Sequence, residues 1–257
     1  MEHTSRNNHD KLLRTEHDAR ALGDDKTMKT TDAVDLAIEH GTETSVMDAS
    51  PAPMEAAASF LRRHAPRDRS RSAVRVLELG CSMAEGGWYS AFDGFDTTGV
   101  DCSQVAVERA RECLRAAGVV ADLRVVDFTQ LPFADGSFDV VIDRSALGSL
   151  GREATGRAFA ELARVLKPTG RLFFNPYSDR HTGARSDRTG PDDLSLDVNT
   201  SSPTGSWQRG FWNARQVTAA LIADWRVLSR QHVEFEEQLS PARQTHAEWR
   251  VIAEKVA

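Results

Sequence analysis

Residues 74–87 read Val74-Arg75-Val76-Leu77-Glu78-Leu79-Gly80-Cys81-Ser82-Met83-Ala84-Glu85-Gly86-Gly87 and decide the predicted fold. The first half is a short apolar run, too short for an independent helix and typical of a buried parallel strand. The second half consists mainly of small residues, which let a backbone turn tightly and approach a ligand closely. The stretch therefore predicts a strand that ends in a tight turn at residue 80.

A second apolar run, Thr97-Thr98-Gly99-Val100, leads into Asp101. This carboxylate follows Gly80 by about twenty residues, as in the nucleotide-binding half of a doubly wound sheet, where it accepts hydrogen bonds from ribose hydroxyls. Taken alone, the loose glycine pattern is equally typical of an ordinary strand-to-helix turn. The rest of the chain must therefore decide between a nucleotide site and a plain turn.

Strands and helices alternate through the middle of the chain, which is the signature of a parallel sheet covered by helices on both faces. Ser103 is the expected N-cap of a helix that ends at Gly118, with Ala106, Ala110, Cys113, Leu114 and Ala117 on one face. Other helices are expected over 84–92, 152–166 and 214–222. Strands are expected over 74–79, 97–101, 123–127, 138–143 and 170–174, and then over 225–235 and 249–256 with a polar loop between them.

Two polar regions flank this core. Residues 1–72 are predicted to form an N-terminal arm with lid-like helices, one of them over about 54–63, ahead of a single domain over 73–257. Residues 177–210 are rich in Ser, Thr, Asp, Arg and Gly and show little periodicity. A connection of this length inside a domain is usually functional or disordered. Both regions are candidate lids.

The bulk properties exclude several classes of protein. The 257 residues carry a net charge of −6 without a long basic run, so a nucleic-acid partner is not expected. No apolar stretch has the length of a membrane span, and the start of the chain lacks the apolar core of a signal peptide. The three cysteines are not spaced as metal ligands, so no metal is expected. A cytoplasmic protein is the simplest interpretation.

Over residues 74–256 the chain resembles the class I S-adenosylmethionine-dependent methyltransferases. The resemblance rests on five motifs in the family's order. They are Glu78-x-Gly80-x-Ser82-x-Ala84, then Asp101, then Asp127-Phe128, then the run from Leu131 to Val141, then Leu166-Lys167-Pro168-Thr169-Gly170. Ser82 and Ala84 replace the second and third glycines of the family's first motif, and Thr169 replaces another glycine. A NAD dehydrogenase, the main rival for the first motif, would not share the later runs.

The resemblance implies a Rossmann-like doubly wound α/β sheet of seven strands, with an antiparallel last strand and helices on both faces. It implies S-adenosyl-L-methionine as cofactor, bound outside the carboxyl ends of the first and fourth strands. Asp101 then takes the ribose, and Asp127 faces the adenine amino group. The expected cofactor-binding residues are Glu78, Gly80, Cys81, Ser82, Asp101, Cys102, Asp127, Phe128 and Asp143.

The expected activity is methyl transfer to a small-molecule nucleophile. Alignment of acceptor and methyl group supplies roughly 7–11 kcal/mol of such a barrier, so a general base is optional. Candidate catalytic residues are Asp143, Tyr177 and His181. Residues 143–147 also resemble the thiopurine and tellurite-resistance methyltransferase subgroup.

Several alternatives remain open from the sequence. One is a cyclase that consumes the cofactor, or other non-methylating chemistry, and another is a silent cofactor-binding module. Asn175-Pro176-Tyr177 is similar to a motif of enzymes that methylate DNA bases, but it follows the fifth strand rather than the fourth. The sequence also leaves a homodimer open.

Overall fold

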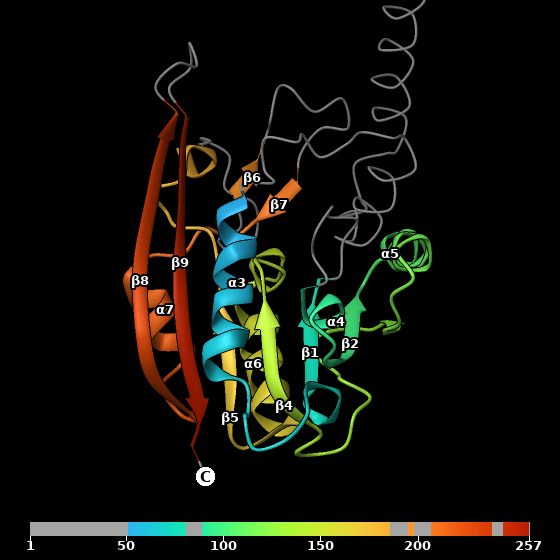
Figure 1. The fold of residues 1–257 in the computed structure, drawn as a ribbon. Helices are drawn as coiled ribbons and strands as arrows, with labels where there is room; N and C mark the ends of the chain where they lie inside the picture. Colours follow the sequence, from blue (N-terminus) through green and yellow to red (C-terminus); the bar gives the residue numbers. More distant parts are fainter. Residues whose placement is uncertain (1–50, 81–88, 186–194, 198–206, 238–243, 257) are drawn as a thin grey trace, which may run out of the picture.

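The structure is a computed structural model and describes residues 51–80, 89–185, 195–197, 207–237 and 244–256. A seven-stranded sheet with the order β3-β2-β1-β4-β5-β9-β8 forms its centre (Figure 1). Strands β1 to β5 are parallel, and β9 is antiparallel to both of its neighbours. The predicted Rossmann-like sheet with an antiparallel last strand is therefore confirmed. The strands are β1 Arg75–Leu79, β2 Asp96–Asp101, β3 Asp122–Val125, β4 Phe138–Asp143, β5 Leu166–Phe174, β8 Trp225–Glu237 and β9 Gln244–Lys255.

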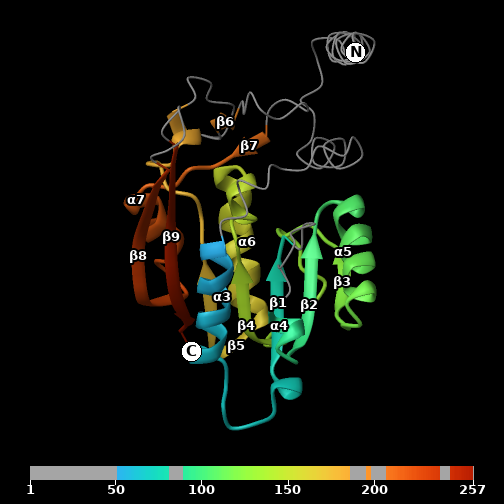
Figure 2. The same ribbon diagram turned by 45° about the horizontal axis from the view of Figure 1, so that its top comes forward.

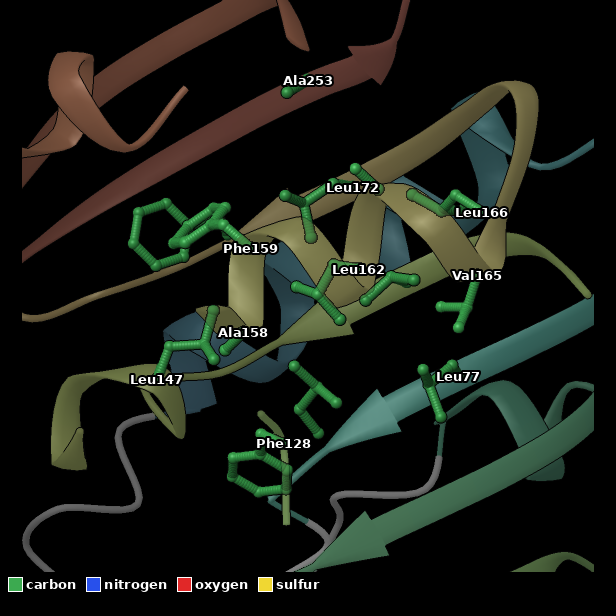
Figure 3. Close-up of a cluster of buried hydrophobic side chains, with 14 of the residues drawn as sticks. Leu77, Phe128, Leu147, Ala158, Phe159, Leu162, Val165, Leu166, Leu172 and Ala253 are labelled. Atoms are coloured by element: carbon green, nitrogen blue, oxygen red, sulfur yellow. The ribbon is translucent and has the colours of Figure 1, made fainter. Parts of the chain in front are cut away.

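Helices cover both faces of the sheet. The first face carries α3 (Pro51–His64), α4 (Tyr89–Phe92) and α5 (Gln104–Ala116), and the second carries α6 (Arg152–Val165) and α7 (Ala214–Ala220). Figure 1 shows α3 in front of the sheet and α6 behind it. Figure 3 shows the larger core cluster, in which Phe159 and Leu162 of α6 pack against side chains of the sheet such as Leu172. No helix in the described ranges is long and apolar enough to span a membrane.

Helix α3 packs directly on the sheet. Its Ala57, Phe60 and Leu61 are buried in a core cluster with Ile142 of β4 and Phe173 of β5. Phe60 and Phe173 stack with their ring centroids 5.3 Å apart. The helix predicted over about 54–63 is thus present and contributes to the core, although the division at residues 72 and 73 stays a prediction. The predicted arm up to residue 50 lies outside the described residues.

Helix α5 has the predicted start and stop. The Ser103 hydroxyl accepts a hydrogen bond from the Ala106 amide at 3.0 Å, and Gly118 has a φ of +67°, which favours glycine. Ala106, Ala110 and Leu114 are buried as expected. The predicted apolar face was wrong for Cys113 and Ala117, which are both exposed, because the helix buries only a narrow stripe against β2 and β3.

The C-terminal hairpin is longer than predicted. Strand β9 begins at Gln244 rather than at 249, and β8 runs on to Glu237, so most of the predicted polar loop is strand. The outer part of the hairpin extends past the carboxyl end of β5, since Phe174, the last residue of β5, pairs with Val251. Figures 1 and 2 show β8 and β9 rising beyond the arrowheads of β1 and β4.

Smaller differences concern the element ends. Strand β3 ends at Val125, so Asp127 lies in the following turn, and β5 starts at Leu166 directly after α6 rather than at 170. Of the helix predicted over 84–92, only α4 falls in the described residues. The polar region after β5 contains the short helix η4 (Thr182–Arg185) and an antiparallel pair of short strands, β6 (Ser195–Asp197) and β7 (Trp207–Arg209).

Candidate functional site

The sheet has a topological switch point between β1 and β4. From β1 the chain moves outward to β2 and β3 on one side, and it then returns to β4 and β5 on the other side. In open α/β sheets, ligands bind outside the carboxyl ends of the strands at such a point. The strand order β3-β2-β1-β4 places Asp127, Asp101, Gly80 and Asp143 at or just after the ends of four neighbouring strands at this edge.

Gly80 makes the turn after β1. Its φ is +69°, a value that residues with a side chain adopt at a cost, and its amide donates to the Val100 carbonyl at 2.8 Å. A Cβ at this position would lie only 2.6 Å from the Cβ of Ala146, in the segment after β4. Gly80 therefore allows the turns after β1 and β4 to approach each other. Cys81 and Ser82 lie outside the described residues.

Glu78 lies on β1 and points towards the face that carries α4. The Ser90 hydroxyl of α4 donates a hydrogen bond to its carboxylate, and the side chain is buried. Burial raises the pKa of Glu78, while the charge of Arg144 and the Ser90 hydrogen bond oppose that rise. These contacts tie α4 to β1 just before the turn at Gly80.

Asp101 and Asp127 are both held by backbone amides. Asp101, at the end of β2, is 7% exposed, and its carboxylate accepts a hydrogen bond from the Ser103 amide at 3.0 Å. Asp127 is exposed, and its Oδ1 accepts hydrogen bonds from the amide and the hydroxyl of Thr129, both at 2.8 Å. Phe128, between Asp127 and Thr129, is buried in the core.

A cavity of about 290 Å³ opens at this part of the edge. Its volume is near the lower end of small-molecule sites, which measure roughly 300–1,000 Å³. It brings together three of the predicted cofactor-binding residues from two segments of the chain. Its lining consists of Cys102, Val125, Val126, Asp127, Phe128, Ser149 and Leu150.

Asp143, at the end of β4, is completely buried. Its Oδ1 accepts a hydrogen bond from the Leu147 amide at 3.0 Å, whereas its Oδ2 has no hydrogen-bond partner in the described part of the chain. Burial raises the pKa of Asp143 to about 7, and the hydrogen bond from Leu147 and the charge of Arg144 limit the rise. A buried oxygen without a partner is costly, so this atom suits contact with a ligand donor.

Tyr177 and His181 lie beyond the end of β5 and contact each other, with ring centroids 5.0 Å apart. The Nδ1 atom of His181 accepts a hydrogen bond from the Gly183 amide at 3.0 Å. Asn175, the first residue of the motif shared with DNA-base methylating enzymes, is buried and donates to the Trp249 carbonyl at 2.7 Å. Its amide therefore fastens β9 to the end of β5.

Sequence reasoning missed two residues that join this group. The His246 ring lies 5.6 Å from the Tyr177 ring and 5.3 Å from the His181 ring, and Glu248 is hydrogen-bonded to His246 at 3.1 Å. Both fall in the polar loop that the sequence predicts between the last two strands. The signal was present, because polar residues at 246, 248 and 250 alternate with Ala247, Trp249 and Val251, as in a strand with one buried face.

A second cavity, of about 420 Å³, lies between α6 and α7 on the second face of the sheet. Its walls include Phe159, Phe211, Trp212 and Trp225, and Leu150 lines both cavities. The rest of its lining comes from α6, α7 and the segments directly before and after α7, and it includes none of the predicted cofactor-binding residues. The smaller cavity is therefore the one that belongs to the carboxyl edge.

The chain was compared with known proteins. Residues 77–174 match the model of a family described as "Methyltransferase domain". These residues form a class I S-adenosylmethionine-dependent methyltransferase domain. The matched stretch runs from β1 to the end of β5 and includes Gly80, Asp101, Asp127 and Asp143.

The relatives of the methyltransferase domain have names that describe several different activities. A 2-methyl-6-phytyl-1,4-hydroquinone methyltransferase of Synechocystis is 39% identical over 107 residues, which cover 41% of this chain and 32% of the relative. An S-adenosyl-L-methionine-dependent Diels-Alderase of Talaromyces variabilis is 35% identical over 162 residues, which cover 58% of this chain and 53% of the relative. These matches span only about a third to a half of each relative.

Solved structures share the fold of the methyltransferase domain. A SAM-dependent methyltransferase of Methanosarcina mazei superposes with a TM-score of 0.64 at 18% identity, covering 77% of this chain and 97% of the other. At this identity the likeness concerns the fold alone.

The edge of the methyltransferase domain fits its cofactor, S-adenosyl-L-methionine. The unpartnered Oδ2 of Asp143 can accept a hydrogen bond from a cationic group, and the absence of a Cβ at Gly80 lets Ala146 and the turn after β4 approach the turn after β1 at this edge. The cavity beside Asp127 and Phe128 combines apolar and polar lining residues, as small-molecule sites do.

Proposed function

We propose that this protein transfers a methyl group from S-adenosyl-L-methionine to a small-molecule nucleophile. The observation that carries the proposal is the row of groups at the carboxyl edge, where Asp127, Asp101, Gly80 and Asp143 lie at or just after the ends of four neighbouring strands. An open α/β sheet binds a nucleotide-like ligand at such an edge.

Each of these residues has a proposed role in binding the cofactor. Asp101 accepts hydrogen bonds from the ribose hydroxyls, and Asp127 with Phe128 and Cys102 surrounds the adenine in the 290 Å³ cavity. Asp143 receives the ammonium group of the methionine portion on its unpartnered oxygen. Glu78 holds the turn in place through α4. Cys81 and Ser82, which lie outside the described residues, remain predicted cofactor contacts.

The acceptor binds beside Asp143, Tyr177 and His181 in this proposal. The bound cofactor supplies an electrophilic methyl group, and the protein's main task is to align the acceptor with it. The Synechocystis relative acts, by its name, on a substituted hydroquinone, which supports a small organic acceptor. The likeness of residues 143–147 to the thiopurine and tellurite-resistance subgroup remains a prediction, as do a cytoplasmic location and a homodimer.

A second candidate function keeps the cofactor but transfers no methyl group. The relative from Talaromyces is named as a Diels-Alderase that depends on S-adenosyl-L-methionine, and its alignment covers 58% of this chain. In that case the same edge would hold the cofactor, and the acceptor site would hold a compound that rearranges internally.

Chromatography of the nucleosides after incubation with S-adenosyl-L-methionine separates the candidates. A methyltransferase is expected to release S-adenosylhomocysteine only when an acceptor, supplied here as a metabolite extract, is present. Release of methylthioadenosine without extract, above spontaneous breakdown, would instead indicate a cyclase that consumes the cofactor. Release of neither nucleoside with extract present, despite tight cofactor binding, would contradict methyl transfer and favour a rearrangement catalyst or a silent module.

Asp101→Asn tests the ribose site. We expect the variant to bind S-adenosyl-L-methionine about 10- to 100-fold more weakly in calorimetry, because a hydrogen bond to a charged group contributes about 1.5–3 kcal/mol. The matched control is Asp96→Asn, at the opposite end of β2, where the exposed carboxylate lies 3.6 Å from Arg75. Equal affinities in the two variants would refute the assignment of Asp101.

A further inference from the structure

A cluster of aromatic and histidine side chains covers the outer end of the C-terminal hairpin. Tyr177, His181 and His246 contact one another pairwise, with ring centroids 5.0–5.6 Å apart. Phe211 adds a ring 5.6 Å from His181, and Phe235 of β8 adds one 6.1 Å from His246. The five rings come from four separate segments of the chain, so the fold itself assembles them at the carboxyl edge.

A buried carboxylate lies beneath this cluster. Glu248 is 3% exposed in its side chain, and its two oxygens face His246 Nε2 at 3.1 Å and Arg250 Nε at 2.6 Å. Positions 246, 248 and 250 alternate along β9, so the three side chains share one face of the hairpin. Burial opposes ionisation of Glu248, but the hydrogen bonds from His246 and Arg250 outweigh it and hold the pKa of Glu248 below its ordinary value.

The contact with Glu248 determines the tautomer of His246. An ionised carboxylate can only accept hydrogen bonds, so Nε2 of His246 carries the proton and Nδ1 carries a lone pair. Among the residues that the structure describes, no hydrogen bond engages His246 Nδ1. His181 has the opposite arrangement, because its Nδ1 already accepts from the Gly183 amide and its Nε2 therefore carries the proton in the neutral ring. Of the two rings, His246 is the one prepared to accept a proton.

A second observation concerns Arg250. Its Nη2 atom is buried, and it has no hydrogen-bond partner within the described ranges of the chain. Burying such a donor costs about 1–3 kcal/mol, which an oxygen of a bound molecule would recover. The aromatic rings on one side and the Arg250 donor on the other favour a flat acceptor molecule that carries an oxygen.

We propose that His246, oriented by Glu248, is the general base that deprotonates a planar aromatic acceptor carrying an acidic hydroxyl group. This inference rests on the proposed methyl transfer and gives it a substrate class. The acceptor hydroxyl gives its proton to His246 Nδ1, and its oxygen forms the bond to the methyl carbon. The bond from that carbon to sulfur breaks with its electron pair remaining on sulfur. The imidazolium then returns its proton to solvent. His246 is thus a catalytic residue, and Glu248 is a positioning residue that stabilises the charged ring.

4-Nitrophenol serves as the probe, since its phenolate absorbs visible light and its phenol does not. In the presence of S-adenosylhomocysteine at pH 6, we expect the wild-type protein to bind the probe and to increase its phenolate absorbance. His246→Gln is expected to bind the probe without that increase, and Glu248→Gln to show a reduced increase. The matched control is His232→Gln, on the opposite face of the same hairpin, where Nε2 contacts the Ser178 hydroxyl at 2.7 Å. It should keep the wild-type signal.

Methyl transfer to the same probe provides the kinetic test. We expect His246→Gln to lower kcat by about 10²–10⁴-fold, with cofactor affinity in calorimetry unchanged. We also expect the rise of kcat/KM with pH to be lost. Among the side chains that the structure describes, the other titratable or charged groups that face His246 are Glu248 and Arg250 on β9 and His181 and Tyr177 after β5.

Two results would overturn the inference. One is a wild-type absorbance change and rate that persist in His246→Gln, and the other is a wild-type protein that does not bind the probe while it binds the cofactor normally. Failure of the wild-type protein to bind the cofactor at all would instead overturn the proposed function on which the inference depends.

Discussion

Replacing Asp143 with asparagine is expected to stabilise the protein at pH 8 while it weakens cofactor binding. The carboxyl is completely buried, and its pKa of about 7 lies well above the ordinary value of 3.8. Between these two values the folded state keeps a proton that the unfolded state has lost. Stability therefore falls as pH rises from about 4 to 7, by an amount on the order of 4 kcal/mol, and changes no further above that range.

Asparagine carries no charge, so the stability of the variant should not show this fall as pH rises. Urea unfolding at pH 5 and pH 8 measures it as the difference between variant and wild type, and the subtraction removes the contributions of other groups such as Glu78. We expect the variant to gain on the wild type as pH rises. An identical pH dependence in both proteins would show that Asp143 is not the buried acid that the structure indicates.

Cofactor binding should respond in the opposite direction. The ammonium group of S-adenosyl-L-methionine favours the ionised carboxylate, so binding to the wild type releases a proton below pH 7, and affinity should increase from pH 5.5 towards about 7.5. Asp143→Asn should bind at least about tenfold more weakly at pH 8, with little dependence on pH. Asp96→Asn again serves as the control. Calorimetry in buffers of different ionisation enthalpy counts the protons released.

Gly80→Ala is expected to have the second large effect. The positive φ of Gly80 costs an alanine about 1–2 kcal/mol, and its Cβ would lie 2.6 Å from the Cβ of Ala146. Crowding of this kind adds about 1–3 kcal/mol. The turn after β4 can relieve it only by moving, and that turn also carries the Leu147 amide that binds Asp143. We expect a loss of roughly 2–5 kcal/mol in stability together with loss of cofactor binding.

Two further variants separate strain from crowding. Gly94 also has a positive φ, of +83°, but a Cβ there would meet nothing within 4 Å, so Gly94→Ala should cost only the backbone strain. Adding Ala146→Gly to Gly80→Ala removes the colliding atom and should recover the crowding part of the loss. Urea unfolding and calorimetry check both. A double variant no more stable than Gly80→Ala would exclude the collision as the cause.

The sheet could be predicted because the central parallel strands β1, β2 and β4 are buried on both faces and are each followed by a helix. Val76 and Leu77 are both fully buried although they face opposite sides of β1, and Ser103 and Gly118 bound α5 as expected. The hairpin could not be predicted as well, because its outer part buries only one side. The polar sequence of its exposed side resembles that of a loop, so His246 and Glu248 were not predicted as site residues.

The sequence could not show which residues of the candidate site lie together, and the reason is a different one. Tyr177, Phe211 and His246 are brought together by two isolated β-bridges. Ser178 bridges to Trp212, next to Phe211, and Tyr177 bridges to Glu248 of β9. That contact crosses about seventy positions of sequence, beyond the reach of any local periodicity. Asp143 was predicted from its place at a strand end, but its unpartnered oxygen and raised pKa depend on burial that spacing cannot reveal.

The hairpin that rises beyond the sheet has an evolutionary consequence. Every residue assigned to the cofactor lies between Glu78 and Asp143, whereas the ring cluster is built from residues 177–246. Mutations can therefore change the ring cluster while the cofactor-binding residues stay the same. Proteins that descend from one ancestral gene could diversify their chemistry through changes in the C-terminal hairpin and in the segments that contact it. To change the acceptor that this protein uses, the residues of the hairpin should be randomised and the turn at Gly80 left unchanged.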